Sequence, residues 1–282
     1  MGHADPHVRR RDRGGHPPLG GVRPARQRKG DLEMTGSSDW RADPRFFSLE
    51  ERVKYALVPP RLYLANLVKR KLRKGEAELH ALEALVRPGG LSIDVGANKG
   101  VYSYLMSQIS DHVAAFEPNP KMYWVLARSV PRNVECHNVA LSDRDGEAEM
   151  ILPVQRSGRY SNQGGTLQKR KMEDSAKETG SIRVEQRRLD GYDFRGVTFI
   201  KIDVEGFEFE VLEGARETLA RERPVLLVEI DEHQNKRPQD EALRIVCDYG
   251  YAVHFVEDGK VHPLAERGAA AGPLGNYVFL PT

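Results

Sequence analysis

Residues 91–95 form a short apolar run that leads directly into a turn with glycine at both ends, Gly96 and Gly100. The apolar residues after the turn recur at helical spacing, and a second apolar run, residues 112–116, ends at Glu117. This order predicts two neighbouring parallel strands joined through a helix. Glu117 would stand at the tip of the second strand, where nucleotide-binding α/β folds place a carboxylate that holds ribose hydroxyls.

The turn between these strands differs from the fingerprint of a dinucleotide site. Its pattern is Gly-x-Asn-x-Gly, and Asp94 brings a negative charge into it. A pyrophosphate requires closely spaced glycines and no such charge, whereas a cationic ligand is favoured by the aspartate. S-adenosylmethionine fits, because its ribose suits Glu117 and its amino and sulfonium groups suit an acidic site. The alternative for the turn alone is an ordinary strand–turn–helix with a solvated aspartate. We also expect the helix start to present unpaired N–H donors.

Charge and cysteine content exclude several classes of function. The net charge is +2, and residues 1–33 carry eight Lys and Arg against four acids, so the rest of the chain is slightly acidic. We therefore expect no nucleic-acid partner. The cysteines, Cys136 and Cys247, form no disulfide framework or metal-binding motif. No apolar run predicts a transmembrane segment or signal peptide, and we expect a cytoplasmic location.

Three regions are expected along the chain. Residues 1–44 are aperiodic and rich in Gly, Pro and Arg, which predicts a disordered basic tail. An arginine-rich anchor for RNA or anionic lipid is the less favoured interpretation, and Met34 is an alternative start, so whether residues 1–33 belong to the native protein stays open. Residues 45–88 predict an N-terminal helical cap, and residues 89–282 predict the catalytic domain.

Within the predicted cap, residues 61–74 form a basic amphipathic helix. Its leucines either pack on the core, which we favour, or touch a membrane surface or an acidic partner. Beyond residue 89, strands and helices alternate, which predicts a mostly parallel sheet covered on both faces. Arg144-Asp145-Gly146 predicts a hairpin, residues 207–219 predict one helix, and residues 153–181 predict a long loop that covers the acceptor or is mobile.

Acidic residues stand at the expected C-terminal ends of separate strands. In an open α/β sheet these ends meet at the ligand-binding edge, so we expect the side chains to converge. Each acid alone is explained by helix capping, but a set of them repels unless a cation or a donor-rich ligand relieves it. The set comprises Asp94, Glu117, Asp203, Glu205 and Glu229, with Asp231 and His233 shortly after.

Four segments together resemble the FkbM-type S-adenosylmethionine-dependent methyltransferases. They are residues 93–100 (IDVGANKG), 116–120 (FEPNP), 138–143 (NVALSD) and 200–206 (IKIDVEG), in the order and at the spacings of that family. The resemblance covers about residues 85–256. It implies a Rossmann-like class I methyltransferase sheet, mostly parallel with an antiparallel strand near the edge. It also implies methyl transfer, usually to a hydroxyl oxygen of a sugar, polyketide or related metabolite.

The same resemblance implies roles for individual residues. The methionine end of the cofactor would be lined by Asp94, Gly96, Asn98 and Gly100. Glu117 would take the ribose hydroxyls, while Ser142 and Asp143 would border the adenine. Asp203 would face the methyl group and the acceptor. We expect Lys99 to point to solvent, and an inward Lys99 would weaken the cofactor assignment at this turn.

The proton of the acceptor hydroxyl must be removed, and Asp203 and His233 are the candidate bases. A divalent ion such as magnesium, held by Asp203 and Glu229 with Asp231 as an optional third ligand, is a less favoured alternative. A nicotinamide-dependent enzyme, an RNA methyltransferase and a non-enzymatic adapter are rival functions. The hydroxylated small-molecule acceptor, the methylated atom and the oligomeric state are not specified by the sequence.

Overall fold

The computed structural model describes residues 40–41, 43–74, 77–161, 164–167, 178–268 and 274–282. The chain divides into two units, Met1–Leu32 and Glu33–Thr282, and every described residue belongs to the second. The tail predicted for residues 1–44 therefore lies almost wholly outside the described residues. Much of the long loop predicted for residues 153–181 lies outside them as well.

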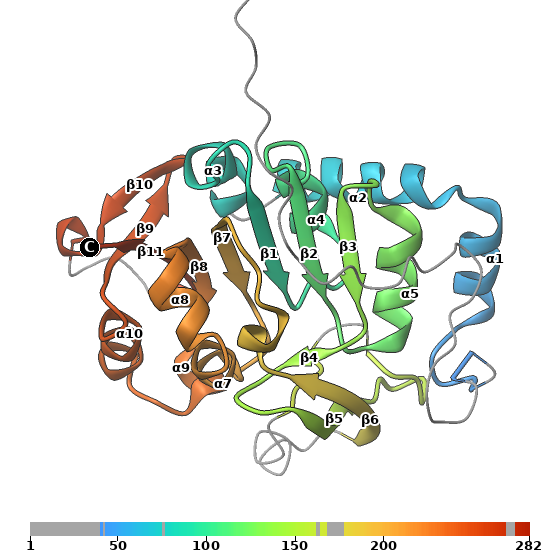
Figure 1. Cartoon of the computed structure of the whole chain (residues 1–282). Helices are drawn as coiled ribbons and strands as arrows, with labels where there is room; N and C mark the ends of the chain where they lie inside the picture. Colours follow the sequence, from blue (N-terminus) through green and yellow to red (C-terminus); the bar gives the residue numbers. More distant parts are fainter. Residues whose placement is uncertain (1–39, 42, 75–76, 162–163, 168–177, 269–273) are drawn as a thin grey trace, which may run out of the picture. The chain divides into compact units, whose positions relative to one another are not determined.

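The main sheet has eight strands in the order β10-β9-β11-β8-β7-β1-β2-β3 (Figure 1). The five strands from β3 to β8 in this order pair in parallel, and β11 runs antiparallel to both of its neighbours. This topology confirms the predicted mostly parallel sheet with an antiparallel strand near the edge. The strands are β1 (Leu91–Val95), β2 (His112–Phe116), β3 (Val134–His137), β7 (Val197–Ile202), β8 (Val225–Glu229), β9 (Tyr251–Glu257), β10 (Lys260–Pro263) and β11 (Asn276–Pro281).

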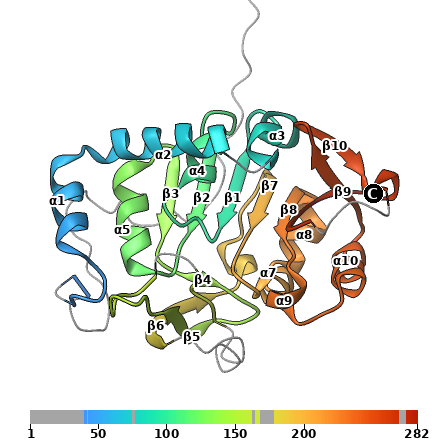
Figure 2. The ribbon, with the colours of Figure 1, turned by 180° about the vertical axis from the view of Figure 1, so that it is seen from behind.

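Helices cover both faces of this sheet (Figures 1 and 2). Side chains alternate between the two faces along each strand. Ile93 and Val95 of β1 lie on one face, and Val113 and Ala115 of β2 lie on the other. The first face packs against α7 (Glu208–Glu213), α8 (Arg216–Glu222) and α10 (Gln239–Cys247). The second packs against α2 (Pro60–Lys74), α3 (Ala77–Leu85), α4 (Val101–Met106) and α5 (Pro120–Ser129).

The helix α2 buries one of its faces, as we expected. Leu64, Leu67 and Val68 are buried with residues of α3 and of the sheet. The helix before it, α1 (Leu49–Leu57), is different, because it has no buried residue. Among the described residues, each helix is either too short or too polar to span a bilayer.

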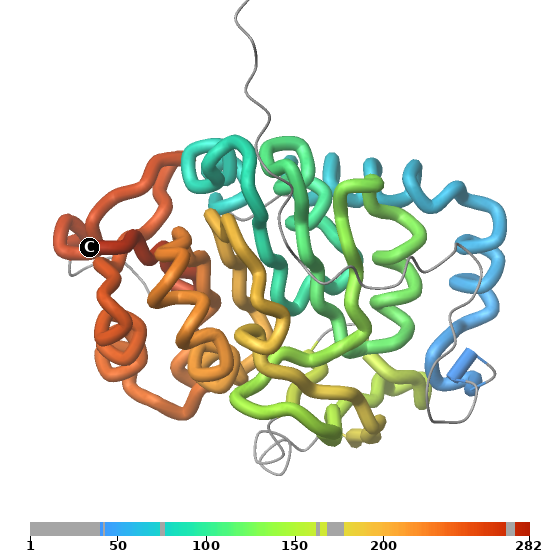
Figure 3. The backbone as a smooth tube through the Cα atoms, viewed as in Figure 1, coloured from blue at the N-terminus to red at the C-terminus, as the bar shows by residue number. Residues whose placement is uncertain are grey.

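A second, three-stranded sheet lies beyond the C-terminal ends of the parallel strands (Figure 3). It consists of β4 (Ala140–Leu141), β5 (Gly146–Pro153) and β6 (Thr179–Arg187), in the order β4-β6-β5. The hairpin predicted at Arg144-Asp145-Gly146 is wrong, because β4 and β5 do not pair with each other. Instead β6 lies between them, parallel to β4 and antiparallel to β5.

The single helix predicted for residues 207–219 is also wrong, because it is divided into α7 and α8 at Gly214. A Cβ atom on Gly214 would lie 1.9 Å from the carbonyl oxygen of Ser142, far inside contact distance. The backbone after β4 therefore touches the backbone between the two helices. This contact anchors the small sheet to the main sheet's helical layer.

Candidate active site

A cavity of about 430 Å³ opens at the C-terminal ends of β1, β2 and β7. The strand order reverses at this point, since β2 continues from β1 on one side and β7 lies on the other. Open α/β sheets bind ligands at such a reversal. The small sheet adds Ala140, Leu141 and Met150 to the wall. Of the acids predicted to converge, Glu117, Asp203, Glu205 and Glu229 line the cavity.

Gly96 holds the turn after β1 against the end of β7. It has a φ of +76°, and a Cβ atom there would lie 1.9 Å from the carbonyl oxygen of Asp203. Only glycine avoids this clash and accepts this φ without strain. Gly96 therefore allows the turn to lie directly against the backbone of Asp203. This contact fixes the position of Asp203 relative to the turn.

The backbone N–H groups of Gly96, Ala97, Asn98 and Gly100 in the turn before α4 are engaged within the protein. Gly96 and Ala97 both donate to the carbonyl oxygen of Phe116, each at 3.0 Å. Asn98 donates to Oε2 of Glu117 at 2.7 Å, and Gly100 donates to the carbonyl oxygen of Ala97 at 2.8 Å. The turn thus binds the tip of β2 and positions Glu117.

The Glu117 carboxylate is buried, yet it lines the cavity. Its second oxygen, Oε1, accepts a hydrogen bond from the backbone N–H of Asn119 at 2.8 Å. Asn138 steadies the same segment, because its Nδ2 donates to the carbonyl oxygens of Glu117 and Pro118 at 2.8 and 3.0 Å. Burial outweighs the two backbone donors and raises the pKa of Glu117 to about 7. Each carboxylate oxygen can accept a further hydrogen bond from a ligand.

Lys201 is the cation that relieves the repulsion among the acids. It faces Asp94 directly across the parallel pairing of β1 and β7. Its Nζ lies 3.6 Å from Oδ1 of Asp94, 3.2 Å from Oδ2 of Asp203 and 3.2 Å from the carbonyl oxygen of Gly96. Burial alone would lower the pKa of Lys201, but Asp203 and Asp94 reverse this and raise it. The ammonium group therefore stays charged.

Asp203 and Glu229 lie in the same environment, but their pKa values shift in opposite directions. Burial opposes ionisation of both side chains. For Asp203 burial is the largest single influence, but the charge of Lys201 together with hydrogen bonds to Glu229 and Lys201 outweighs it and lowers the pKa. For Glu229 the neighbouring Asp203 charge adds to burial, and the pKa is raised to about 9. At neutral pH the pair therefore holds one proton on Glu229 and one negative charge on Asp203.

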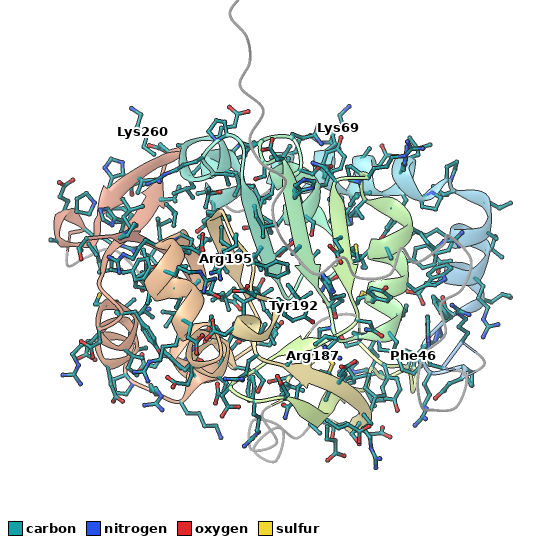
Figure 4. The ribbon with its side chains drawn as sticks, in the orientation of Figure 1. Phe46, Lys69, Arg187, Tyr192, Arg195 and Lys260 are labelled. Atoms are coloured by element: carbon teal, nitrogen blue, oxygen red, sulfur yellow. The ribbon has the colours of Figure 1, made fainter. Side chains whose placement is uncertain are left out.

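Aromatic contacts fix the ring of Phe116, which lines the cavity at the end of β2. The ring stacks on the imidazole of His137 with centroids 4.6 Å apart, and it meets the ring of Tyr192 edge-on at 5.1 Å. Figure 4 shows Tyr192 beside the C-terminal ends of the parallel strands. These contacts leave Phe116 little freedom to move into the cavity.

Several predicted site residues lie beside the cavity rather than in its wall. Asp94 is fully buried beneath it, where it accepts a hydrogen bond from Oγ of Ser103. Gly100 faces Leu126, whose Cδ1 would lie 2.6 Å from an added Cβ. Ser142 and Asp143 follow the lining residue Leu141 without lining the cavity themselves.

His233 is exposed on α9 (Glu232–Asn235) and does not line the cavity. Asp231 accepts a hydrogen bond from the backbone N–H of Gln234 at 3.0 Å and so caps the same helix. Neither residue joins Asp203 and Glu229 at the cavity. In the described part of the chain, no group of three or more His, Cys, Asp and Glu is arranged to hold a metal ion.

The sequence reasoning missed the cations of the cavity. Lys201 was marked only by standing in an otherwise apolar strand, which is a usable signal for a buried ion pair. Arg70 and Lys71 of α2 line the cavity as well, a role that we did not predict for that helix. Lys99 is half-buried and also lines the cavity, against our expectation that it points to solvent. Its charge counts against a cationic methionine end next to this side chain.

The described part of the predicted long loop lines the cavity through Ser161 and residues 164–167. It is tied to the turn after β7, because the Thr166 hydroxyl donates to the carbonyl oxygen of Glu205 at 2.9 Å. The backbone N–H of Gly164 donates to Oε1 of Glu205 at 3.2 Å. Glu205 therefore joins the loop to the site and does not face the cavity as an isolated charge.

Comparison with known proteins identifies the family. The family model described as Methyltransferase FkbM domain matches residues 94–253, which is more than half of the chain. The chain belongs to the FkbM methyltransferase family. It is 29% identical over 184 residues to the methyltransferase sdnD of Sordaria araneosa, covering 54% of this chain and 70% of that one.

Solved structures give more distant similarities to this methyltransferase. The methyltransferase FkbM of Methylobacillus flagellatus shares 16% identity at a TM-score of 0.46, covering 72% of this chain and 47% of that one. The chain thus spans about half the length of that protein. A TehB-like SAM-dependent methyltransferase of Corynebacterium glutamicum shares 11% identity at a TM-score of 0.40, covering 78% of this chain and 98% of that one.

The raised pKa of Glu229 predicts a pH-dependent stability difference between wild type and Glu229→Gln. In the unfolded chain this carboxyl ionises near 4.5, whereas in the folded protein it ionises at about 9. The stabilisation from the protonated form is therefore complete below pH 4.5 and is lost as the pH rises towards 9. Glutamine stays neutral, so the stability of Glu229→Gln relative to wild type should rise with pH, by at most about 1.4 kcal/mol per unit.

Urea denaturation at pH 5, 6, 7, 8 and 9 measures this difference. Glu257→Gln, at an exposed position at the end of β9, is the matched control and should show no comparable trend. A constant difference between Glu229→Gln and wild type over this range would contradict the assignment of the proton to Glu229.

Proposed function

We propose that this methyltransferase uses S-adenosylmethionine to methylate a hydroxyl oxygen of a sugar, polyketide or related metabolite. The observation that carries the proposal is the Glu117 carboxylate, buried at the cavity wall with each oxygen held by one backbone N–H. A ribose presents two adjacent hydroxyl donors, which match two carboxylate oxygens with remaining acceptor capacity. The family assignment supports methyl transfer but leaves the acceptor open.

The residues of the cavity fit the proposed cofactor. Burial raises the pKa of Glu117 despite its two backbone donors, and two ribose hydroxyl donors would favour its ionised form. Apolar side chains close to it, Val139, Ala140 and Leu141, offer a surface for the adenine ring. Gly96 and Asn98 line the adjacent wall, where the methionine part would extend. Lys99 restricts that part to positions where its carboxylate, not its ammonium group, meets the lysine.

When bound, the cofactor supplies a methyl group attached to a positively charged sulfur atom. The residues of this chain must then hold an acceptor hydroxyl nearby and accept its proton. We propose Asp203 for this role, because it lines the cavity and remains ionised beside Lys201, whereas His233 lies elsewhere. Gly96 and Lys201 fix Asp203 from its backbone and its side chain. We further propose that the helices within residues 45–88 cap the site, since Leu67 of α2 lines the cavity.

Glu117→Ala should weaken the binding of S-adenosylhomocysteine, the demethylated product. Charge-assisted hydrogen bonds contribute about 1.5–3 kcal/mol each, so loss of even one corresponds to at least about a tenfold increase in Kd. Isothermal titration calorimetry measures the Kd, and circular dichroism checks the fold. Glu135→Ala on the neighbouring strand β3 removes an acid that does not line the cavity, and it should bind like wild type. Unchanged affinity in Glu117→Ala would defeat the ribose assignment.

Asp203→Asn should keep the affinity for S-adenosylhomocysteine but lower turnover at least about a hundredfold, the lower end for loss of a general base. Turnover is measured with methyl-labelled S-adenosylmethionine and a panel of hydroxylated sugars, polyketides and RNA. His233→Asn is the matched variant, and its turnover should equal that of wild type. If Asp203→Asn retains full turnover, Asp203 has no part in proton removal. Transfer to RNA alone would contradict the proposed acceptor class.

A further inference from the structure

Large hydrophobic side chains are concentrated on one part of the surface. Among the described residues, those with marked exposure are Leu49 (78%), Val53 (49%), Leu57 (76%) and Leu62 (54%). All four lie within residues 49–62, on α1 and the first turn of α2. Single exposed leucines are ordinary, but a group of this kind marks an interaction site. We call this group the apolar stripe.

The stripe belongs to a helix that is fixed in place. Leu49, Val53 and Leu57 are spaced four residues apart, so they share one face of α1. The opposite face is held to the body of the protein. There Oε1 of Glu51 lies 2.8 Å from Nζ of Lys121, and the ring of Tyr55 meets that of Trp124 edge-on at 5.7 Å. Ser48 and Glu51 also form a complete capping box at the start of the helix.

α1 is therefore presented with its apolar face outward, and it is not a loosely attached segment. Figures 1 and 2 agree, since α1 lies outside α2 and α5 and away from the strands of the sheet in both views. A helix that has no buried residue but a regular apolar face is suited to a partner outside the chain.

Basic residues adjoin the stripe along α2. This helix carries six Lys and Arg and no acid in its sequence. Arg61, Lys69, Arg70 and Arg73 are exposed, and Figure 4 shows Lys69 pointing away from the protein.

We propose that the apolar stripe and the exposed basic residues of α2 bind the surface of an anionic lipid membrane. Apolar side chains beside a basic helix face are the pattern of interfacial membrane attachment, in which leucines enter the headgroup boundary and basic residues bind anionic lipids. A protein partner would require an acidic rim around an apolar groove. The exposed Arg61, Lys69 and Arg73, on a helix without an acid, match a continuous negatively charged lipid surface better.

The binding surface and the catalytic cavity share a helix. α2 lines the cavity with Leu67, Arg70 and Lys71, while Lys69 and Arg73 belong to its exposed face. A membrane bound along this face therefore touches the element that closes the site. The inference concerns where the enzyme works and is independent of the acceptor that it methylates.

Sedimentation of the full chain with lipid vesicles tests the proposal. Vesicles of phosphatidylcholine alone are compared with vesicles that contain phosphatidylglycerol. Two variants reduce the proposed contacts: Leu49→Gln with Leu57→Gln, and Lys69→Gln with Arg73→Gln. Arg144→Gln with Arg183→Gln is the matched control, since it removes the same charge from exposed positions next to and within the small sheet. Circular dichroism confirms that each variant is folded.

We expect wild type and the control to bind the anionic vesicles and to bind phosphatidylcholine weakly. Each test variant should bind the anionic vesicles at least about tenfold more weakly. Wild type that fails to bind anionic vesicles would overturn the proposal. Equal binding by the leucine variant and wild type would also overturn the proposal, because it would show that only the charges bind the vesicles. If wild type dimerises in solution and the leucine variant does not, the stripe is a protein interface and the proposal is wrong.

Discussion

The pairing of Lys201 with Asp94 across β1 and β7 is the interaction on which the site depends. Burial raises the pKa of Asp94, whereas the charge of Lys201 and the hydroxyl of Ser103 favour its ionised form, and breaking such a buried pair by removing one partner is strongly destabilising. Here the ammonium group also reaches Asp203 and the carbonyl oxygen of Gly96. The Lys201 side chain thus connects the C-terminal parts of β7 and β1, the turn after β1, and the residue proposed to take the acceptor's proton.

This arrangement gives two carboxylates of the cavity different properties. Asp203 lies beside the cation, and its pKa is lowered despite burial. Glu117 relies on two backbone donors, and burial raises its pKa to about 7. The first remains charged without a ligand, whereas the second gains from additional hydrogen-bond donors. Separate environments within one cavity would allow the proposed division of roles, in which Asp203 takes a proton and Glu117 binds the cofactor.

Much of this organisation could be predicted from local patterns. Buried runs such as residues 91–95 and 112–116 identify strands without knowledge of their partners, and the antiparallel strand followed from the family resemblance. Glu117 was found because its position at a strand tip is a local property. The division of α7 from α8 could not be predicted in this way, because it follows from a contact between Gly214 and Ser142, which are distant in sequence. The hairpin failed for a similar reason, since β6 comes from residues 179–187 and displaces β5 from β4.

The positions of charged side chains in the cavity were harder to predict from the sequence than the positions of the buried strands. The set of acids predicted a cavity dominated by negative charge, but Lys201, Arg70, Lys71 and Lys99 share its wall. Whether a charged side chain points into a cavity depends on strand register and helix rotation. Neither can be predicted from the identity and local position of a single residue. Lys201 illustrates this point, because its partner Asp94 is defined only by the register of β1 and β7.

The most direct test of the account is the proton balance of cofactor binding. If Glu117 accepts the ribose hydroxyls, binding favours its ionised form and lowers a pKa that is about 7 without a ligand. Calorimetric titration with S-adenosylhomocysteine at pH 6, in buffers of different ionisation enthalpy, measures the protons exchanged. We expect the release of close to one proton. Binding without proton release, or no binding at all, would contradict it.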